Sequence, residues 1–176
     1  MILISVVRSY LKSCKDKERG RVMYNASDLT AEQRATLAKG LRSVMGDTYA
    51  LYVKTHGYHW NVTGPRFKSL HEMFMEQYTE LWTALDEIAE RLRAIGEFAP
   101  GSTEAILENA SIKPDNSQPD AEAMIENLAK GHDMLSTTLK KALEGASEVG
   151  DDVTVDLYTQ RMTISQKTAW MLRSSV

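Results

Sequence analysis

The apolar residues of this 176-residue chain recur at the three- and four-residue spacing of amphipathic helices. A first stripe covers residues 31–60 and a second covers residues 67–95, with Gly64-Pro65 between them. Thr30 and Gln33 form a capping-box pattern that opens the first helix, and Gly96 ends the second. The two stripes consist of Leu37, Leu41, Val44, Leu51 and Tyr58, then Phe67, Phe74, Leu81, Leu85, Ile88, Leu92 and Ile95.

The second half of the chain predicts two more long helices after a long connection. Residues 96–119 hold three of the four prolines and leave room for a short helix over residues 102–110, capped by Ser102. A third helix is predicted over residues 120–143, and a fourth from Asp151 or Asp152 to Arg173. No strand-like alternation occurs. Four long helices with one long crossover between the second and third predict an all-α, ferritin-like four-helix bundle.

The charge of the chain is unevenly placed. The formal net charge is −3, but residues 1–22 carry +4, which leaves −7 for the remainder. We therefore divide the chain into a disordered basic extension, residues 1–26, and a folded domain, residues 27–176, and the charge of the extension suits contact with an anionic partner, of which DNA is one possibility. An alternative is that translation starts at Met23 and the arm is never made. The arm's basic side chains are Arg8, Lys12, Lys15, Lys17, Arg19 and Arg21.

The sequence predicts a cytoplasmic protein, associated with the nucleoid if it binds DNA. No apolar run approaches the ~20 residues of a membrane span, so no membrane partner is expected. The positive charges follow the apolar segment 1–7 instead of preceding it, which argues against a signal peptide. The single Cys14 excludes an internal disulfide and a cysteine-built metal site, which fits a reducing compartment.

Two histidines and two acids, His59, His71, Asp86 and Glu90, form a candidate metal-ligand set. Imidazole and carboxylate together suit iron and zinc. His71 and Asp86 are 15 residues apart on one predicted helix, hence roughly 22 Å apart along its axis, whereas ligands approach a metal to about 2.0–2.2 Å. If all four serve one site, the histidines come from one subunit and the acids from another, across a two-fold axis.

A helical wheel supports this interpretation, because Asp86 and Glu90 point away from the core stripe of their own helix. The alternative is that they are an ordinary solvated acidic pair. His56-x-x-His59 is weak evidence for metal by itself, and His132 lies on an apolar face and is predicted to be a core histidine. The Glu-x-x-His pattern is absent at all four histidines, which argues against a di-iron site inside one bundle.

The run KTHGYHWNVTGP, residues 54–65, strongly resembles the Dps family, the DNA-protecting mini-ferritins of starved bacteria. The resemblance covers about residues 27–175 and continues in Phe67, Leu70–Phe74, Asp86–Arg91, Gly150–Asp152, Asp156, Leu157 and Trp170–Arg173. It implies a dodecameric shell built from two-fold dimers that oxidises Fe(II) with hydrogen peroxide, preferred over oxygen, and stores ferric mineral. The catalytic metal ligands that it implies are His59 and His71 of one subunit with Asp86 and Glu90 of its mate.

Two departures from the family pattern are visible. Met75 stands where members usually place Asp or Glu four residues after the second histidine, which should weaken binding of a second iron. Ser165-Gln166-Lys167 stands where the family often has His-Glu-Lys, and we expect this to affect packing. Near the site, the adjoining Trp60 either scavenges stray oxidising equivalents or packs as an interfacial aromatic.

Three acids at the start of the fourth helix, Asp151, Asp152 and Asp156, either line an iron entry pore or complement the helix dipole. Two rival functions also remain open. One is a DNA-compacting structural shell with weak or no ferroxidase activity, in which DNA meets the arm through Lys12, Lys15, Lys17, Arg19 and Arg21. The other is a shell that binds zinc at the same ligands without redox chemistry.

Overall fold

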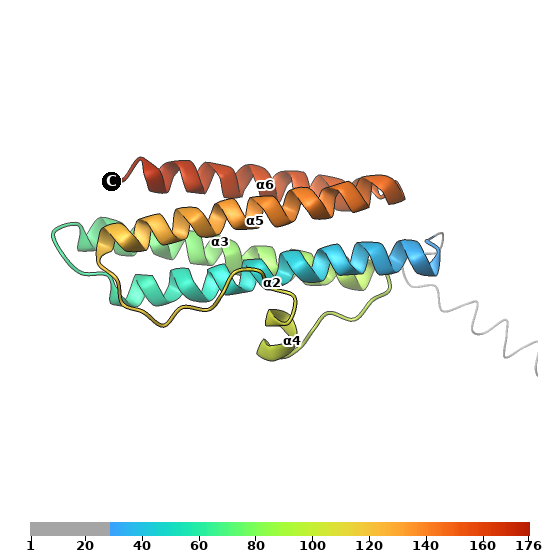
Figure 1. Cartoon of the computed structure of the whole chain (residues 1–176), viewed down its shortest axis with the longest axis horizontal. Coiled ribbons are helices and arrows are strands. Elements are labelled where there is room, and N and C mark those ends of the chain that lie inside the picture. Colours follow the sequence, from blue (N-terminus) through green and yellow to red (C-terminus); the bar gives the residue numbers. More distant parts are fainter. Residues whose placement is uncertain (1–28) are drawn as a thin grey trace, which may run out of the picture.

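The computed structural model describes residues 29–176, and these residues form helices without any strand. Figure 1 shows α2 (Ala31–Asn61), α3 (Phe67–Ala94), α5 (Ala121–Val149) and α6 (Asp152–Arg173) as four long rods lying side by side. The short α4 (Thr103–Leu107) lies outside them, beside α2. Because α3 and α5 run in the same direction, the connection between them travels back along the bundle. The predicted four-helix bundle with a long crossover is confirmed.

Two of the helices, α2 and α4, begin at the side-chain caps Thr30 and Ser102 that the sequence predicts. The Thr30 hydroxyl accepts from the Gln33 amide at 3.2 Å, while the Gln33 side chain accepts from the Thr30 amide at 2.9 Å. Ser102 and Asp120 accept from the backbone three residues on and cap α4 and α5. Two predicted bounds were wrong, since α4 is shorter than residues 102–110 and α5 continues past residue 143.

The longer α5 has a local cause at two glycines. Gly145 stays helical and lies against Thr36 of α2, so packing between the helices compensates its low helix propensity. The residue that ends α5 is Gly150, whose φ of 79° is the left-handed conformation that glycine adopts without strain. The sequence prediction therefore ended this helix one glycine too early.

The core fills the space between the four long helices with the predicted stripes. The stripe residues of α2 are at most 3% exposed, and those of α3 from Phe74 onward are also buried. Phe67 is an exception, because it is 46% exposed and its ring lies 5.1 Å from the ring of His71. It is the first residue of α3, at the end of the bundle, so assigning it to the core was wrong.

The crossover is fastened to the bundle by Asp47, a fully buried carboxylate on α2. It accepts from the Ser111 amide at 2.6 Å, the Ser111 hydroxyl at 2.8 Å, the Ile112 amide at 2.8 Å and the Thr138 hydroxyl at 2.6 Å. Next to it, Gly46 lets α2 approach the crossover, since a Cβ there would lie 2.9 Å from the Ile106 carbonyl oxygen. One buried acid thus joins α2, α5 and the crossover.

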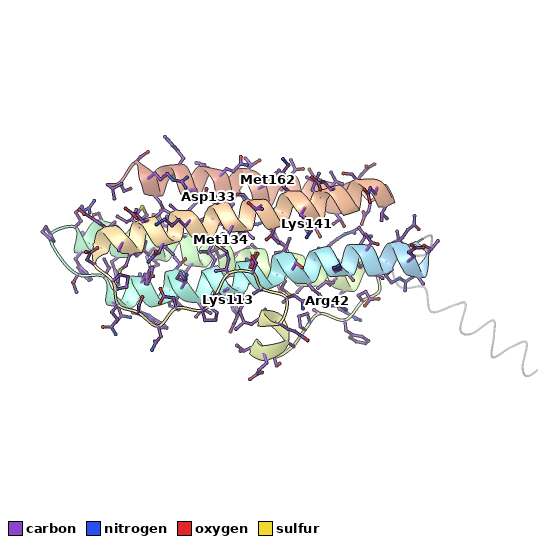
Figure 2. All side chains as sticks on the ribbon, viewed as in Figure 1. Arg42, Lys113, Asp133, Met134, Lys141 and Met162 are labelled. Atoms are coloured by element: carbon purple, nitrogen blue, oxygen red, sulfur yellow. The ribbon has the colours of Figure 1, made fainter. Side chains whose placement is uncertain are left out.

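Arg42 holds the start of the same crossover, as Figure 2 shows at the outer side of α2. Its guanidinium donates to the Glu97 carboxylate at 3.0 Å. Cys14 and the basic arm lie outside the described residues, so the predictions that concern them are not tested. Within residues 29–176, no helix is both long enough and apolar enough to cross a lipid bilayer.

Candidate metal centre

His59, near the end of α2, and His71, near the start of α3, face each other. Figure 1 shows the loop that joins these two helices at one end of the bundle. The two imidazole rings are stacked, with centroids 3.7 Å apart. His59 Nδ1 lies 2.7 Å from the His71 carbonyl oxygen, and His71 Nδ1 lies 2.8 Å from the His59 carbonyl oxygen. The two residues therefore hold each other through a reciprocal pair of hydrogen bonds across the helix interface.

These hydrogen bonds fix the tautomer of both rings. A carbonyl oxygen only accepts, so Nδ1 of each histidine must carry the proton and donate. The lone pair of each neutral ring is then on Nε2, the atom left to bind a metal ion. A backbone carbonyl that holds the other ring nitrogen is a common partner of a metal-ligating histidine. The pair is thus oriented before any ion arrives.

Other aromatic rings pack around the pair. His56 stacks on Tyr78 with centroids 4.0 Å apart, and Tyr78 meets the His59 ring edge-on at 5.1 Å. Burial, together with the nearby His59, lowers the pKa of His56. Trp60 is 65% exposed and its ring lies 4.1 Å from that of His56. Both proposed roles of Trp60 fit this position beside the pair.

Asp86 and Glu90 lie exposed on α3, turned away from the core as the helical wheel predicts. Asp86 borders a surface hollow of about 490 Å³ next to Trp82, and Glu90 borders another of about 390 Å³ between α3 and α6. Among residues 29–176, no three His, Cys, Asp or Glu side chains come together as a metal site. A single chain brings the two histidines together, but it does not bring Asp86 and Glu90 to them.

An exposed stripe on α3 connects the histidine to the acid. Phe67, His71, Met75, Trp82 and Asp86 follow one another at spacings that keep them on one face of the helix. Met75 is 43% exposed and Trp82 is 60% exposed. Large apolar side chains thus remain exposed along this face of the helix, and such patches are typical of contact surfaces.

The three acids at the start of α6 have different surroundings. Asp151 is half-buried and accepts two hydrogen bonds from Arg91, at 2.7 Å each, and one from the Thr154 hydroxyl at 2.6 Å. Burial by itself would raise the pKa of Asp151, but the bonds from Thr154 and Arg91 lower it. Asp152 and Asp156 are exposed. Their assignment to a pore stays a prediction, and Asp151 also caps α6.

His132 lies in the core between α5 and α6, as predicted. It is 2% exposed, and its Nδ1 lies 3.0 Å from the Ser165 hydroxyl, which donates in turn to the His132 carbonyl oxygen at 3.1 Å. Its Nε2 has no hydrogen-bond partner among the described residues. Burial and the charge of Arg161 lower the pKa of His132 to about 4.

Sequence reasoning missed the tyrosines around the histidine pair. Tyr49, Tyr52 and His56 lie three and four residues apart on α2, and Tyr78 and Trp82 lie four apart on α3. This spacing puts each set on one helix face, and that periodicity was the available signal. These aromatic residues form a second stripe beside the apolar stripe of the core.

The comparisons with known proteins agree with this geometry. A family model described as Ferritin-like domain matches residues 38–176. The chain is 41% identical over 134 residues to DNA protection during starvation protein 2 of Bacillus anthracis, covering 76% of this chain and 92% of the relative. It is 39% identical over 150 residues to a low temperature-induced protein of Nostoc, covering 84% of each.

A solved structure is similar over most of its length. The Dps protein of Vibrio cholerae, described as a member of the ferritin-like diiron-carboxylate superfamily, matches with a TM-score of 0.81 and 32% identity. The match covers 86% of this chain and 95% of that one. The chain therefore belongs to the ferritin-like proteins. Within that class it is a member of the Dps family, as the Lys54–Pro65 motif indicated.

Proposed function

We propose that this protein is a ferroxidase mini-ferritin that oxidises Fe(II), preferably with hydrogen peroxide, at a site shared by two copies of the chain. The observation that carries the proposal is the reciprocal hydrogen bonding of His59 and His71, which leaves the Nε2 lone pair of each ring for a metal ion. Two imidazoles are half of a usable ligand set, and the second half must be oxygen donors.

The positions of the residues along α3 support Asp86 and Glu90 of a second copy as the oxygen donors. In an antiparallel pair of α3 helices, a two-fold axis near residues 78 and 79 sets His71 opposite Asp86. The same axis sets Phe67 opposite Glu90 and Met75 opposite Trp82. One symmetry operation thus pairs His71 with Asp86 and the apolar Met75 with Trp82, and such self-complementarity is what a two-fold interface requires.

The exposed apolar residues supply a reason for the copies to associate. Trp60, Phe67, Met75 and Trp82 all lie on α2 or α3 near the proposed site. Pairing removes these side chains from water, and the burial of apolar surface stabilises the pair by about 25 cal/mol per Å². The same contact brings the acids to the histidines, so assembly and formation of the site are one event.

The reaction transfers two electrons. Two Fe(II) ions, bound as substrate at neighbouring sites, reduce one hydrogen peroxide with two protons to two waters and leave two Fe(III). The histidine and carboxylate ligands stabilise the higher charge of the product, while open coordination positions admit the oxidant. Because peroxide receives both electrons, hydroxyl radical is not released. This is the protective part of the chemistry.

We further propose that twelve copies form a hollow shell that stores the ferric product and protects DNA. Relatives at up to 41% identity are named for DNA protection during starvation, which supports the protective role. The acidic residues 23–176, with a net charge of −7, repel DNA, so direct contact with DNA is assigned to the basic arm. That arm lies outside the described residues.

Mixing two inactive variants tests the shared site. His71→Ala and Asp86→Ala should each abolish rapid Fe(II) oxidation by peroxide, because each removes a ligand from every site. When the two variants exchange subunits, a mixed dimer has one interface lacking both groups and one interface retaining both. About half of the sites per mixed dimer should therefore recover activity. Met134→Ala, a change at an exposed α5 position labelled in Figure 2, is the matched control.

Two outcomes would contradict the proposal. No recovery on mixing, with subunit exchange confirmed by native mass spectrometry, would refute a shared site. Zinc that binds at His59 and His71 while Fe(II) is oxidised at an unchanged rate would show that these ligands serve a structural metal instead. The same native mass spectra measure the number of chains in the assembly.

A further inference from the structure

A third hollow lies between α2 and α5, beside the crossover. Its volume is about 430 Å³, a size typical of small-molecule sites. Three segments build it, because α2 and α5 form its long walls and the crossover contributes Asn109 and Ser111. No residue of its lining belongs to α3, which carries the proposed two-fold interface. The hollow is therefore separate from the candidate metal centre.

Two lysines on opposite walls bring positive charge to this hollow. Lys39 lies on α2 and Lys141 on α5, and both are exposed. Figure 2 shows Lys141 on the side of α5 that is next to α2. Neither lysine forms an ion pair with another residue in the range 29–176. Two ammonium groups thus line one hollow of a domain whose residues 23–176 carry −7.

The single acid in the lining, Asp47, is already fully hydrogen-bonded. Its carboxylate accepts from two backbone amides and two hydroxyls, which belong to Ser111, Ile112 and Thr138. Four bonds use all the acceptor positions of a carboxylate, so Asp47 offers none to the lysines. With two lysines and one aspartate, the formal charge of the lining is +1.

The floor of the hollow is made of small residues. Gly40, Ala142 and Gly145 carry at most a methyl group, so a ligand there would lie close to both helix backbones. A Cβ at Gly40 would lie 3.0 Å from the Tyr158 hydroxyl, which therefore packs against this floor from the core side. That hydroxyl is buried and has no hydrogen-bond partner among the described residues. A polar group is thus left unpaired next to the floor.

We propose that this hollow binds the phosphate group of a small phosphomonoester. Such a group carries about −1.5 to −2 charges at pH 7 and three strong acceptor oxygens. Lys39 and Lys141 supply two ammonium groups, which bind phosphate as point charges, and Ser43 and Asn109 of the same lining add a hydroxyl and an amide. The remaining space over the small floor accommodates the organic part. We call this site the phosphate hollow.

Calorimetric titration of the full-length, metal-free protein tests the phosphate hollow. Glycerol phosphate should bind once per chain with a sub-millimolar dissociation constant, and inorganic phosphate should bind more weakly because it lacks the organic part. Glycerol alone should not bind. No saturation by glycerol phosphate below about 10 mM would overturn the proposal. Equal affinity for the two phosphates would overturn the assignment to an ester and give the hollow to free phosphate.

Matched lysine variants assign the binding to the hollow. Lys39→Gln and Lys141→Gln each remove one charge from the lining and should weaken the binding of glycerol phosphate about ten-fold or more. Lys140→Gln removes the same charge from the preceding residue of α5, which is not part of the lining, and should leave the affinity unchanged. Equal affinities in all three variants would show that only the overall charge of the surface acts, and would overturn the proposal.

The phosphates of duplex DNA are a second source of the same chemistry, and fluorescence anisotropy distinguishes them. Lys39→Gln and Lys141→Gln should bind a duplex as tightly as the unchanged protein does, because a hollow between two helices is too narrow for a double helix. A parallel loss of affinity for DNA and for glycerol phosphate would make the lysines part of a DNA-binding surface and overturn the proposal. The titrations contain no iron, so their outcome is independent of the ferroxidase proposal.

Discussion

The His59–His71 pair and His132 place the same side chain in two opposite surroundings. In all three residues Nδ1 is engaged, with backbone carbonyls at the pair and with the Ser165 hydroxyl at His132. The pair lies at the end of the bundle beside an exposed stripe, whereas His132 is enclosed between α5 and α6. An imidazole whose tautomer is fixed becomes a metal ligand only where ions and other ligands can reach it.

Burial and the charge of Arg161 explain why the pKa of His132 is lowered. The first cause is burial, because a charged imidazole in the core loses its hydration. The second is Arg161, which lies near His132 and is paired with Glu80, with one N–O distance of 2.9 Å. The difference between the two regions can be tested from both sides.

The largest expected effect is that alanine at His71 and alanine at His132 have opposite consequences for Fe(II) oxidation and for stability. His71→Ala should lose rapid Fe(II) oxidation, while the free energy of unfolding falls only by about 0.5–1.5 kcal/mol, the usual contribution of one hydrogen bond such as that to the His59 carbonyl oxygen. His132→Ala should keep oxidation but lose about 2–4 kcal/mol of stability, since it leaves a core cavity and removes the hydrogen bond from Nδ1 to the Ser165 hydroxyl. Stopped-flow oxidation and urea unfolding of both proteins measure this. Loss of oxidation in both would remove the distinction.

Several parts of this comparison were accessible from the sequence. The spacing of His71 and Asp86 on one helix means that a single site using both residues would need two chains, and the wheel correctly predicted that both acids are exposed. The burial of His132 followed from its place in an apolar stripe. These conclusions depend only on helical periodicity, which local sequence determines.

Other features depend on how helices meet, and no local pattern encodes that. The His59 ring finds the carbonyl of His71 only because α2 and α3 pack in one register. Asp47 reads as a surface acid, yet Ser111, Ile112 and Thr138 converge on it from two distant segments. Phe67 was misplaced for the same reason, since the wheel gives its direction and not where the bundle ends.

The second-largest effect concerns the arm and the acidic domain. A chain starting at Met23 should bind duplex DNA an order of magnitude or more weakly at physiological salt, since residues 23–176 carry −7. Fe(II) oxidation should be unchanged, because the ligand set is intact. The control keeps the full length but replaces Lys12, Lys15, Lys17, Arg19 and Arg21 by Gln. Fluorescence anisotropy that finds equal affinity in all three proteins would show that DNA binds elsewhere.

The buried histidine predicts a specific loss of stability in acid. The pKa of His132 is about 4 in the folded protein and 6.5 in the unfolded chain, so between these values the unfolded chain holds the extra proton. Stability should fall as pH drops through this window, by about 3 kcal/mol in total. Above the window His132 contributes no pH dependence. His132→Asn, which keeps a donor toward Ser165, should flatten the urea-unfolding profile there, and an identical profile would exclude His132.

The smallest effect is expected at Met75, where the site and the interface compete. Met75→Glu adds a carboxylate one turn after His71 and should tighten a second Fe(II), raising the rate of oxidation by peroxide a few-fold. It should also weaken association modestly, since the proposed two-fold dimer sets Met75 opposite Trp82 of the second copy and a charge there would lose the sulfur–aromatic contact. Met75→Gln is the control, because it has the same shape without the charge.

Two measurements separate the effect on iron binding from the effect on association. Stopped-flow rates at two irons per site report on the second iron, and native mass spectrometry reports on the dimer population. If Glu and Gln raise the rate equally, the gain comes from a looser interface; if neither changes it, position 75 does not reach the metal.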